Sequence, residues 1–162
     1  MAAFAATFIS LFFGLIPGWV ADLNREQGWP RWQNTAGQVM GVVLSGVSLG
    51  VVLYCSHLFS RLGKGTPVPI DPPRALVVSG LFRFSRNPIY VAQVGILLSY
   101  FSYSGELALL LYAGSWALLV QAFVVWLEEP DLRRRFGDAY VEYTHAVPRW
   151  VGPPARRRNG TG

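Results

Sequence analysis

Charged residues are scarce in this chain. Asp, Glu, Lys and Arg make up only 14% of its 162 residues, whereas 52% are hydrophobic. The mean hydropathy of +0.32 lies outside the usual balance of a soluble domain. Because a helix of about 20 apolar residues satisfies its own backbone hydrogen bonds inside a bilayer, this composition predicts an all-α integral membrane protein.

Cysteine and histidine are also rare. Cys55 is alone, so no intrachain disulfide can form, and with His57 and His145 it makes no recognisable zinc pattern. We therefore expect no metal. Cys55 could be a reactive thiol or a palmitoylation site, but a cysteine inside an apolar helix is more often a small buried hydrophobe. The chain also lacks a Gly-rich phosphate loop and a Gly-x-Ser-x-Gly motif.

Four apolar runs cover much of the chain: residues 2–21, 36–59, 89–103 and 107–127. We expect four membrane-spanning helices. The third run is short, so its helix should take in residues around Pro88, which suits a first helical turn, or thin the bilayer locally. In the first run, Gly14, Pro17 and Gly18 should bend the helix or end it early.

The first run could also be read as a secretory signal peptide. A signal peptide has a basic region before its apolar stretch, and no Lys or Arg precedes Arg25. We expect the run to stay in the mature protein.

Small residues recur every four positions in the second run, at Gly37, Gly41 and Ser45 and again at Gly46 and Gly50. This spacing lets helix backbones approach closely. We expect it to serve packing within the chain. Homo-oligomerisation through the same helix is the alternative.

The third and fourth runs are separated by little more than Ser104-Gly105-Glu106. So short a connection predicts an antiparallel hairpin whose two ends lie at the same membrane face. Arg86 and Glu128 lie at these two ends. They should therefore be neighbours.

Basic residues gather after the second and the fourth run: Arg61, Lys64, Arg74, Arg83 and Arg86, then Arg133, Arg134, Arg135, Arg149, Arg156, Arg157 and Arg158. We therefore expect the N-terminus, loop 60–88 and the C-terminus to face the cytoplasm, in the cell (inner) membrane. The net charge of +5 could indicate nucleic-acid binding. However, basic residues beside membrane segments are attracted by anionic lipid headgroups, and we expect no nucleic-acid partner.

The chain should form one domain over residues 1–162. We divide it into two N-terminal helices (1–60), a core (61–152) and a flexible basic tail (153–162). The length of the chain suits a single domain.

The core contains two kinds of polar segment. Residues 63–73 are too rich in Gly and Pro for a helix and predict an ordered, extended loop, followed over 74–83 by a mixed segment that can lie against the helices. After Pro130, apolar and aromatic residues recur at helical spacing with arginines between them: Leu132, Phe136, Tyr140 and Tyr143. This pattern predicts an amphipathic helix at the membrane interface.

Several short motifs follow one another in the core: Gly65-Thr66-Pro67, Leu76-Val77-x-Ser79-Gly80-x-Phe82-Arg83, Arg86-Asn87-Pro88-x-Tyr90, Glu128-Glu129, Phe136-Gly137-x-x-Tyr140-x-x-Tyr143 and Val147-Pro148-Arg149-Trp150. In this order and spacing, residues 63–152 resemble the isoprenylcysteine carboxyl methyltransferase family and its phospholipid methyltransferase relatives. The resemblance implies an integral membrane enzyme that uses S-adenosylmethionine. It also implies a cofactor site built from C-terminal helices and loops.

By position in the family's motifs, the resemblance implies cofactor contacts at Arg74, Ala75, Leu76, Val77, Phe82, Arg86, Asn87, Pro88, Ile89, Tyr90 and Glu128. Asn87 stands where the family usually has a histidine. Because an asparagine cannot titrate, we expect no proton transfer at this position.

Electrostatics supports a cofactor site at these residues. S-adenosylmethionine carries a carboxylate, an ammonium and a sulfonium, and charges beside lipid require fixed partners. Arg86 can fork onto the carboxylate, Glu128 can receive the ammonium or the ribose hydroxyls, and Tyr90 can offer its ring to a cation. Alternatively, Arg86 extends to lipid headgroups and Glu128 marks the end of a span. Their joint placement favours the cofactor site.

The methyl acceptor is less constrained. In eukaryotic members of the resembling family, an arginine thought to hold the substrate carboxylate lies four residues before the cofactor glutamate, where this chain has Val124. A carboxylate needs only alignment with the methyl group, whereas an amine with a pKa of about 10 must first lose a proton. The nearest bases are Glu129, Glu142 and His145. We take Arg86 and Glu129 as the candidate catalytic residues.

We therefore expect a methyltransferase that moves a methyl group from S-adenosylmethionine to a lipophilic or amphiphilic acceptor in the lipid bilayer, with carboxyl O-methylation favoured. A phospholipid amine N-methyltransferase is the alternative enzyme. The alternative of another class is a non-catalytic membrane scaffold that binds partner helices and anionic lipid.

Overall fold

A computed structural model describes residues 7–63 and 76–153. These residues are almost entirely helical, as predicted, and the one β-type pairing among them is an isolated bridge between Arg31 and Glu106. The elements in chain order are η1 (Leu11–Leu15), α2 (Ile16–Glu26), α3 (Thr35–Leu58), η2 (Phe59–Gly63), η3 (Gly80–Arg83), α4 (Pro88–Ser104), α5 (Leu107–Phe123), η4 (Val124–Glu128), α6 (Glu129–Phe136) and α7 (Asp138–Ala146). The predicted loop over 63–73 and most of the tail lie outside the described residues.

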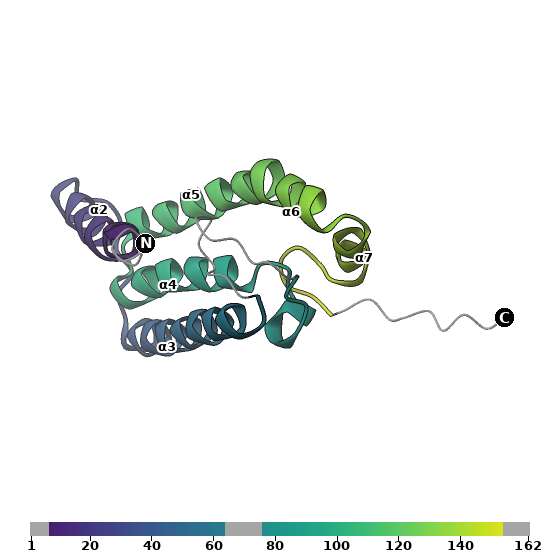
Figure 1. Ribbon diagram of the computed structural model, residues 1–162. Coiled ribbons are helices and arrows are strands. Elements are labelled where there is room, and N and C mark those ends of the chain that lie inside the picture. The colour runs from purple at the N-terminus through teal and green to yellow at the C-terminus, as the bar shows by residue number, and fades with distance from the viewer. Residues whose placement is uncertain (1–6, 64–75, 154–162) are drawn as a thin grey trace. The chain divides into compact units, whose positions relative to one another are not determined.

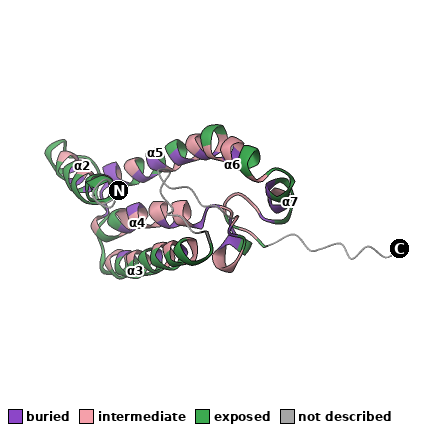
Figure 2. Cartoon of the chain, viewed as in Figure 1, coloured by how far each residue is buried: buried purple, intermediate pink, exposed green. Residues whose placement is uncertain are grey.

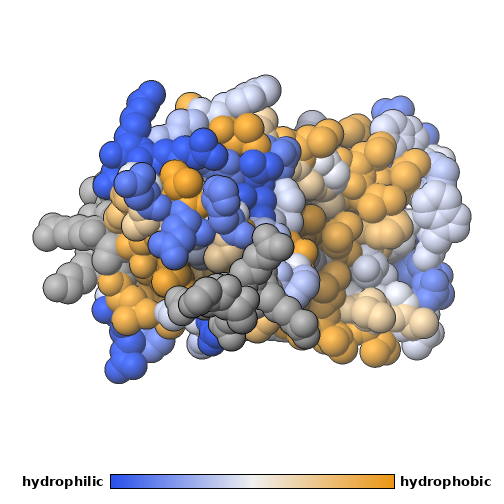
Figure 3. Space-filling model, turned by 90° about the vertical axis from the view of Figure 1, so that its right-hand side faces the viewer, coloured by the Kyte–Doolittle hydropathy of each residue, from blue (hydrophilic) through white to orange (hydrophobic). Residues whose placement is uncertain are grey.

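Within the described ranges, three helices are long and apolar enough to cross a membrane: Thr7–Glu26, Thr35–Leu62 and Leu107–Phe136. Helix α4 begins at Pro88, as expected, but has only 17 residues. Four spans therefore stay a prediction. The helices present exposed residues along much of their length (Figure 2). In Figure 3 hydrophobic residues cover one broad area of the surface, which suits contact with lipid.

The chain divides into two compact units. The first consists of Met1–Leu53 and Ala92–Gln121, and the second of Tyr54–Val91 and Ala122–Gly162. Helices α3, α4 and α5 each contribute residues to both units.

In the first unit, two glycines of α3 lie against the backbone of α4, which runs beside it in Figure 1. A Cβ on Gly37 would lie 2.6 Å from Ser102 O, and one on Gly41 would lie 2.8 Å from Ser99 O. Any larger residue would push the two helices apart. The expected packing within the chain is thus confirmed for this pair. A Cβ on Gly46, by contrast, would have no described atom of another segment within 4 Å.

The first helix does not end at its glycines and proline but runs on to Glu26. The prediction of an early end is therefore wrong. The irregularity is absorbed by η1, a π-helical turn over Leu11–Leu15 that lies just before Pro17. A π-turn widens the helix by one residue and lets the chain continue past a residue that cannot donate its N–H.

Two tyrosines complete the hydrogen bonding of this turn. Pro17 has no N–H to give to the carbonyls four and five residues before it, those of Phe13 and Phe12. The Tyr100 hydroxyl donates to Phe13 O at 2.6 Å, and the Tyr112 hydroxyl donates to Phe12 O at 2.9 Å. An unsatisfied carbonyl is costly in an apolar environment, so these hydroxyls stabilise the bent helix.

The predicted α4–α5 hairpin is present, and its tight connection depends on Gly105. This residue has a φ of +72°, and a Cβ on it would collide with the carbonyl carbon of Trp32. The neighbouring Glu106 is fully buried and accepts a 2.7 Å hydrogen bond from Arg25 Nε. Asn24 Oδ1 accepts from Ala108 N at 3.0 Å and so caps the start of α5.

In the second unit, one amphipathic helix starting at Pro130 was the expectation, and this is wrong. Helix α6 follows α5 and η4 without a break, and Pro130 lies just after the π-helical turn η4, as Pro17 lies just after η1. The helix then ends at Gly137, whose φ is +53°, and α7 starts in a new direction (Figure 1). A buried cluster forms on α7 from Tyr140, Tyr143 and Val147, with Leu76, Leu132 and Phe136 packed against it.

Cys55 lies in the part of α3 that belongs to the second unit. Its side chain has no exposed area. The expectation of a small buried hydrophobe at this position is thus confirmed. His57 is exposed, near the end of the same helix.

Candidate functional site

The two ends of the hairpin meet in the second unit, as the short connection predicted. Arg86 Nη1 donates to Glu129 Oε1 at 3.1 Å, and the Tyr90 hydroxyl donates to Glu128 Oε2 at 2.8 Å. The pairing differs in one respect from the expected one. Arg86 meets Glu129 instead of Glu128.

A π-helical turn explains this pairing. In η4 the N–H of Glu129 bonds to Val124 O, five residues back. The extra residue rotates everything after it by about 100° relative to an uninterrupted α-helix. Glu129 therefore takes the direction that residue 128 would otherwise have, and each of the two adjacent glutamates acquires its own partner.

Among the described residues, Arg86 has hydrogen-bond partners on only one side of its guanidinium. Both of the side-chain hydrogen bonds that it makes to these residues leave from Nη1, to Glu129 Oε1 and to the Tyr140 hydroxyl at 3.4 Å. The side chain is only 10% exposed, and Nε is buried without a partner among the described residues. Nε and Nη2 point the same way and form the fork that binds a carboxylate with two hydrogen bonds.

Arg149 uses that same fork on Glu129. Its Nε donates to Oε1 at 2.6 Å and its Nη2 donates to Oε2 at 3.0 Å. Glu129 is only 8% exposed in its side chain, and Arg149 is 33% exposed. Two guanidinium groups thus share one carboxylate, which gives this Arg86–Glu129–Arg149 cluster a formal charge of +1.

The segment carrying Arg149 is fastened to the segment carrying Arg86. Arg86 N donates to Pro148 O at 3.0 Å, and Gly152 N donates to Phe84 O at 3.1 Å. The Asn87 side-chain amide donates to Arg149 O at 3.1 Å. We call residues 147–152 the C-terminal clip, since they close onto the start of α4.

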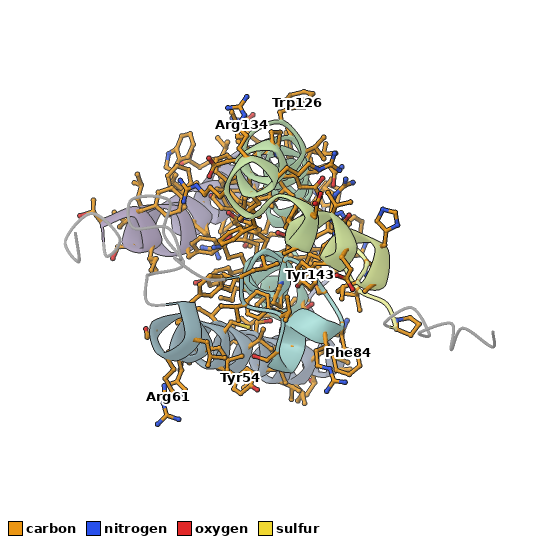
Figure 4. The ribbon with its side chains drawn as sticks, turned by 45° about the vertical axis from the view of Figure 1, so that its right-hand side comes forward. Tyr54, Arg61, Phe84, Trp126, Arg134 and Tyr143 are labelled. Carbon is orange, nitrogen blue, oxygen red and sulfur yellow. The ribbon has the colours of Figure 1, made fainter. Side chains whose placement is uncertain are left out.

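Glu128 and Tyr90 form the second polar group of the site. The Tyr90 ring also packs edge-on to Phe123, with ring centroids 6.4 Å apart. Because the Tyr90 hydroxyl uses only Oε2, the other oxygen of Glu128 accepts no hydrogen bond within the described parts of the chain. Trp126, two residues earlier, points away from the helices and is 75% exposed (Figure 4).

Tyr143 on α7 holds the segment that precedes Arg86. The Tyr143 hydroxyl donates to Phe82 O at 2.7 Å, and burial raises the pKa of this phenol well above its ordinary value. Figure 4 shows Tyr143 lying among other side chains. Phe82 is itself buried and packs edge-on to Phe59, and Leu76 packs on the α7 cluster.

The other residues expected to line a cofactor are placed as follows. Val77, Asn87 and Pro88 are buried, and Ile89 is half-buried. Arg74 and Ala75 lie outside the described residues. Of the candidate bases, Glu142 and His145 are exposed on α7, whereas both oxygens of Glu129 are bound by arginines.

The contacts of Arg149 and Tyr140 were not predicted from the sequence. Arg149 belongs to the Val-Pro-Arg-Trp motif, so the motif marked the position, but nothing in its spacing indicated that it would meet Glu129. The Asn87 side chain holds the clip, and its expected contact with the cofactor stays a prediction.

Comparison with known proteins assigns the family. The sequence profile of the phospholipid methyltransferase family matches residues 36–139, which is more than half of the chain. Searches of curated proteins and of solved structures gave no match. The matched range includes all of α3 but its first residue, the hairpin, Arg86 and both glutamates. The chain therefore belongs to the phospholipid methyltransferase family, a family of integral membrane methyltransferases that includes the isoprenylcysteine carboxyl methyltransferase-like proteins.

Proposed function

We propose that this protein transfers a methyl group from S-adenosylmethionine to a lipophilic or amphiphilic acceptor that arrives through the bilayer. The cofactor would be held in the second unit, at the Arg86–Glu129–Arg149 cluster and at the Glu128–Tyr90 pair. When bound, S-adenosylmethionine supplies an electrophilic methyl group. The work of the chain is to bind its charges, orient it and exclude water.

The observation that carries the proposal is the free edge of Arg86. A buried guanidinium edge with no partner at Nε is costly unless a ligand completes it. The cluster around it has a net formal charge of +1, so the missing partner is an anion. The carboxylate of an amino-acid moiety fits this fork in both geometry and charge.

Glu128 and Tyr90 supply the complementary charge. The Glu128 oxygen that Tyr90 leaves unused can accept a hydrogen bond from an ammonium or a ribose hydroxyl. The ring of Tyr90 can face a cation. A site with one positive and one negative pole matches the zwitterionic methionine part of the cofactor, which supports the assignment of the Arg86–Tyr90 motif and Glu128.

We favour carboxyl O-methylation because an amine acceptor needs a base, and the candidate base Glu129 is engaged by two arginines. Glu129 is bound by Arg86 and Arg149, so it is poorly placed to accept a proton. A carboxylate acceptor needs none to be removed. The description of the matched family favours the alternative, N-methylation of a phospholipid amine, for which Glu128 or an exposed residue such as His145 would have to serve as base. A non-catalytic membrane scaffold is the alternative of another class.

We place the clip and the polar site on the cytoplasmic face of the cell (inner) membrane, together with the N-terminus and loop 60–88. The arginines after η4 support this orientation. Contact between copies of the chain would use the free face of α3 that carries Gly46 and Gly50, because nothing in the described chain covers those glycines.

The test is equilibrium binding of S-adenosylmethionine to the purified full chain in nanodiscs. We expect saturable binding, weakened about tenfold or more in Arg86→Ala and in Glu128→Gln, because a hydrogen bond to a charged group contributes about 1.5–3 kcal/mol. Arg135→Ala is the matched control, since Arg135 pairs with Asp131 on the exposed side of α6. Absence of saturable binding, or equal affinity in all variants, would contradict the assignment as an enzyme.

The acceptor is tested by transfer of radiolabelled methyl groups into extracted lipids. Label released by mild base indicates an ester and supports carboxyl methylation. Label that resists base and travels with an amine headgroup supports the alternative.

A further inference from the structure

Two arginines, Arg86 and Arg149, bind Glu129, and they make different numbers of hydrogen bonds to it. Arg149 binds both carboxylate oxygens through its Nε–Nη2 edge, at 2.6 and 3.0 Å. Arg86 contributes only Nη1, at 3.1 Å. Arg149 therefore uses its Nε–Nη2 edge on Glu129, whereas the Nε of Arg86 has no partner in the part of the chain that the structure describes.

Arg149 is held at both its side chain and its backbone. Its carbonyl accepts the Asn87 amide at 3.1 Å, and the Pro148 carbonyl accepts Arg86 N at 3.0 Å. This fastening fixes the distance from which the guanidinium reaches Glu129. An asparagine at position 87 suits the task, because it donates through a group whose charge does not change with pH.

Without Arg149, the buried Glu129 carboxylate would have only Arg86 close to it among the described side chains that bind it. Arg86 already touches Oε1 through Nη1, so a small rotation would bring the neighbouring Nη2 onto the freed Oε2 and make an end-on Nη1/Nη2 pair. Such a bidentate pair is the strongest arrangement open to an arginine and a carboxylate. Nη2 would then be used on Glu129, and the Nε–Nη2 edge of Arg86 could no longer bind a ligand carboxylate with two hydrogen bonds.

We propose that Arg149 is a positioning residue: by taking both oxygens of Glu129, it reserves the Nε–Nη2 edge of Arg86 for the carboxylate of the bound cofactor. This inference rests on the proposed function. It adds that selectivity for a ligand with a carboxylate is set by a residue that does not touch the ligand.

The test compares two ligands, S-adenosylmethionine and its decarboxylated analogue, by calorimetric titration of the full chain in nanodiscs. The wild type should prefer the ligand with a carboxylate by about tenfold or more, the effect of one charged hydrogen-bond pair. In Arg149→Ala the preference should fall to about twofold or less, while affinity for the decarboxylated analogue changes little. A general loss of folding would weaken both ligands alike.

A second variant should restore the preference for the carboxylate that Arg149→Ala removes. In the Glu129→Gln/Arg149→Ala double variant, a neutral amide no longer captures Arg86, and the preference for the carboxylate should return. Arg149→Gln and Glu129→Gln/Arg149→Gln repeat the comparison with a side chain closer in size, should the alanine variant fail to fold. Arg135→Ala is the control and should keep the wild-type ratio.

The outcomes separate this inference from the proposed function. If the wild type binds neither ligand, the proposed function fails and the role of Arg149 fails with it. If the wild type prefers the carboxylate and the Arg149 variants keep the same preference, only the role of Arg149 is overturned. Loss of both ligands in the single variant without recovery in the double variant also overturns it, since that pattern indicates a purely structural residue.

Discussion

Arg86 and Arg149 bind the same carboxylate but through different edges: Arg149 donates from Nε and Nη2, whereas Arg86 donates from Nη1 alone. The difference leaves a buried, unpartnered Nε on Arg86 within the described chain. Arg149 alone would be enough to form a stable ion pair with Glu129. A ligand therefore explains better why a second buried arginine, Arg86, leaves its Nε without a described partner. This relationship is the basis for the proposed binding of an anionic ligand group in the second unit.

Replacing Arg86 separates binding from folding. In Arg86→Lys the charge remains but the fork is lost, so S-adenosylmethionine affinity should fall about tenfold, nearly as far as in Arg86→Ala. Stability should fall little in either variant, because Arg149 still binds both oxygens of Glu129. Titration calorimetry and thermal unfolding measure the two effects. A lysine variant with wild-type affinity would show that a point charge is sufficient.

Tyr90 and Glu128 should contribute unequally. Tyr90→Phe removes one hydrogen bond at 2.8 Å but keeps the ring and the carboxylate, so cofactor affinity should fall only about threefold. Glu128→Gln removes the charge and should cost about tenfold or more. Titration calorimetry compares the two variants. Equal losses in both would indicate that the hydroxyl itself contacts the ligand.

Tyr143 gives the stability of the second unit a dependence on alkaline pH. Burial raises the pKa of its phenol, so the folded chain keeps a proton that the unfolded chain releases at a pH of about 10. The stability from this proton is fully present below that pH and is lost as the pH rises. The unfolding midpoint should therefore drop steeply above a pH of about 10, and less steeply in Tyr143→Phe. Parallel curves for the two proteins would contradict this.

The ion pair at the hairpin connection should stabilise the first unit. Arg25→Ala leaves the fully buried Glu106 carboxylate without its 2.7 Å partner, and we expect a loss of about 2 kcal/mol, below the full value for a buried pair because Arg25 is half-exposed. Asp22→Ala, which removes the exposed partner of the same arginine, is the control and should change stability by less than about 0.5 kcal/mol. Denaturant or thermal unfolding measures the stability of both variants, and equal losses would contradict a special role for the Arg25–Glu106 pair.

Glycine substitutions in α3 test the helix packing. Gly41→Ala places a methyl group 2.8 Å from Ser99 O and should lower the unfolding midpoint, because the backbone of α4 has to move. Gly46→Ala, where nothing described lies within 4 Å, should leave the monomer as stable as the wild type or slightly more stable. If Gly46→Ala changed the oligomeric state instead, the free face of α3 would be the contact between copies of the chain.

Hydropathy and connection length predicted the parts of this fold that depend on apolar period alone. The three-residue link of residues 104–106 was enough to predict the hairpin and the meeting of its ends. Gly37 and Gly41 were correctly taken as packing residues. These features follow from local chemistry that a sequence displays directly.

The other features of the fold and of the site depend on contacts that the spacing of apolar residues does not predict. A π-turn in η4 changed which glutamate faces Arg86, and no residue type marks such a turn in advance. Another π-turn lets the first helix continue past Pro17. The carbonyls of this turn accept hydrogen bonds from Tyr100 and Tyr112, which lie far along the chain. The role of Arg149 required the knowledge that the clip returns to the start of α4, which only tertiary structure supplies.

The most direct test of the proposed cofactor site is the affinity of the purified full chain for S-adenosylmethionine, measured for the wild type, Arg86→Ala and Arg135→Ala in the same nanodiscs. We predict saturable binding by the wild type, unchanged binding by Arg135→Ala and a loss of about tenfold or more in Arg86→Ala. A wild type that does not bind, or an Arg86→Ala variant that binds as tightly as the wild type, would contradict it.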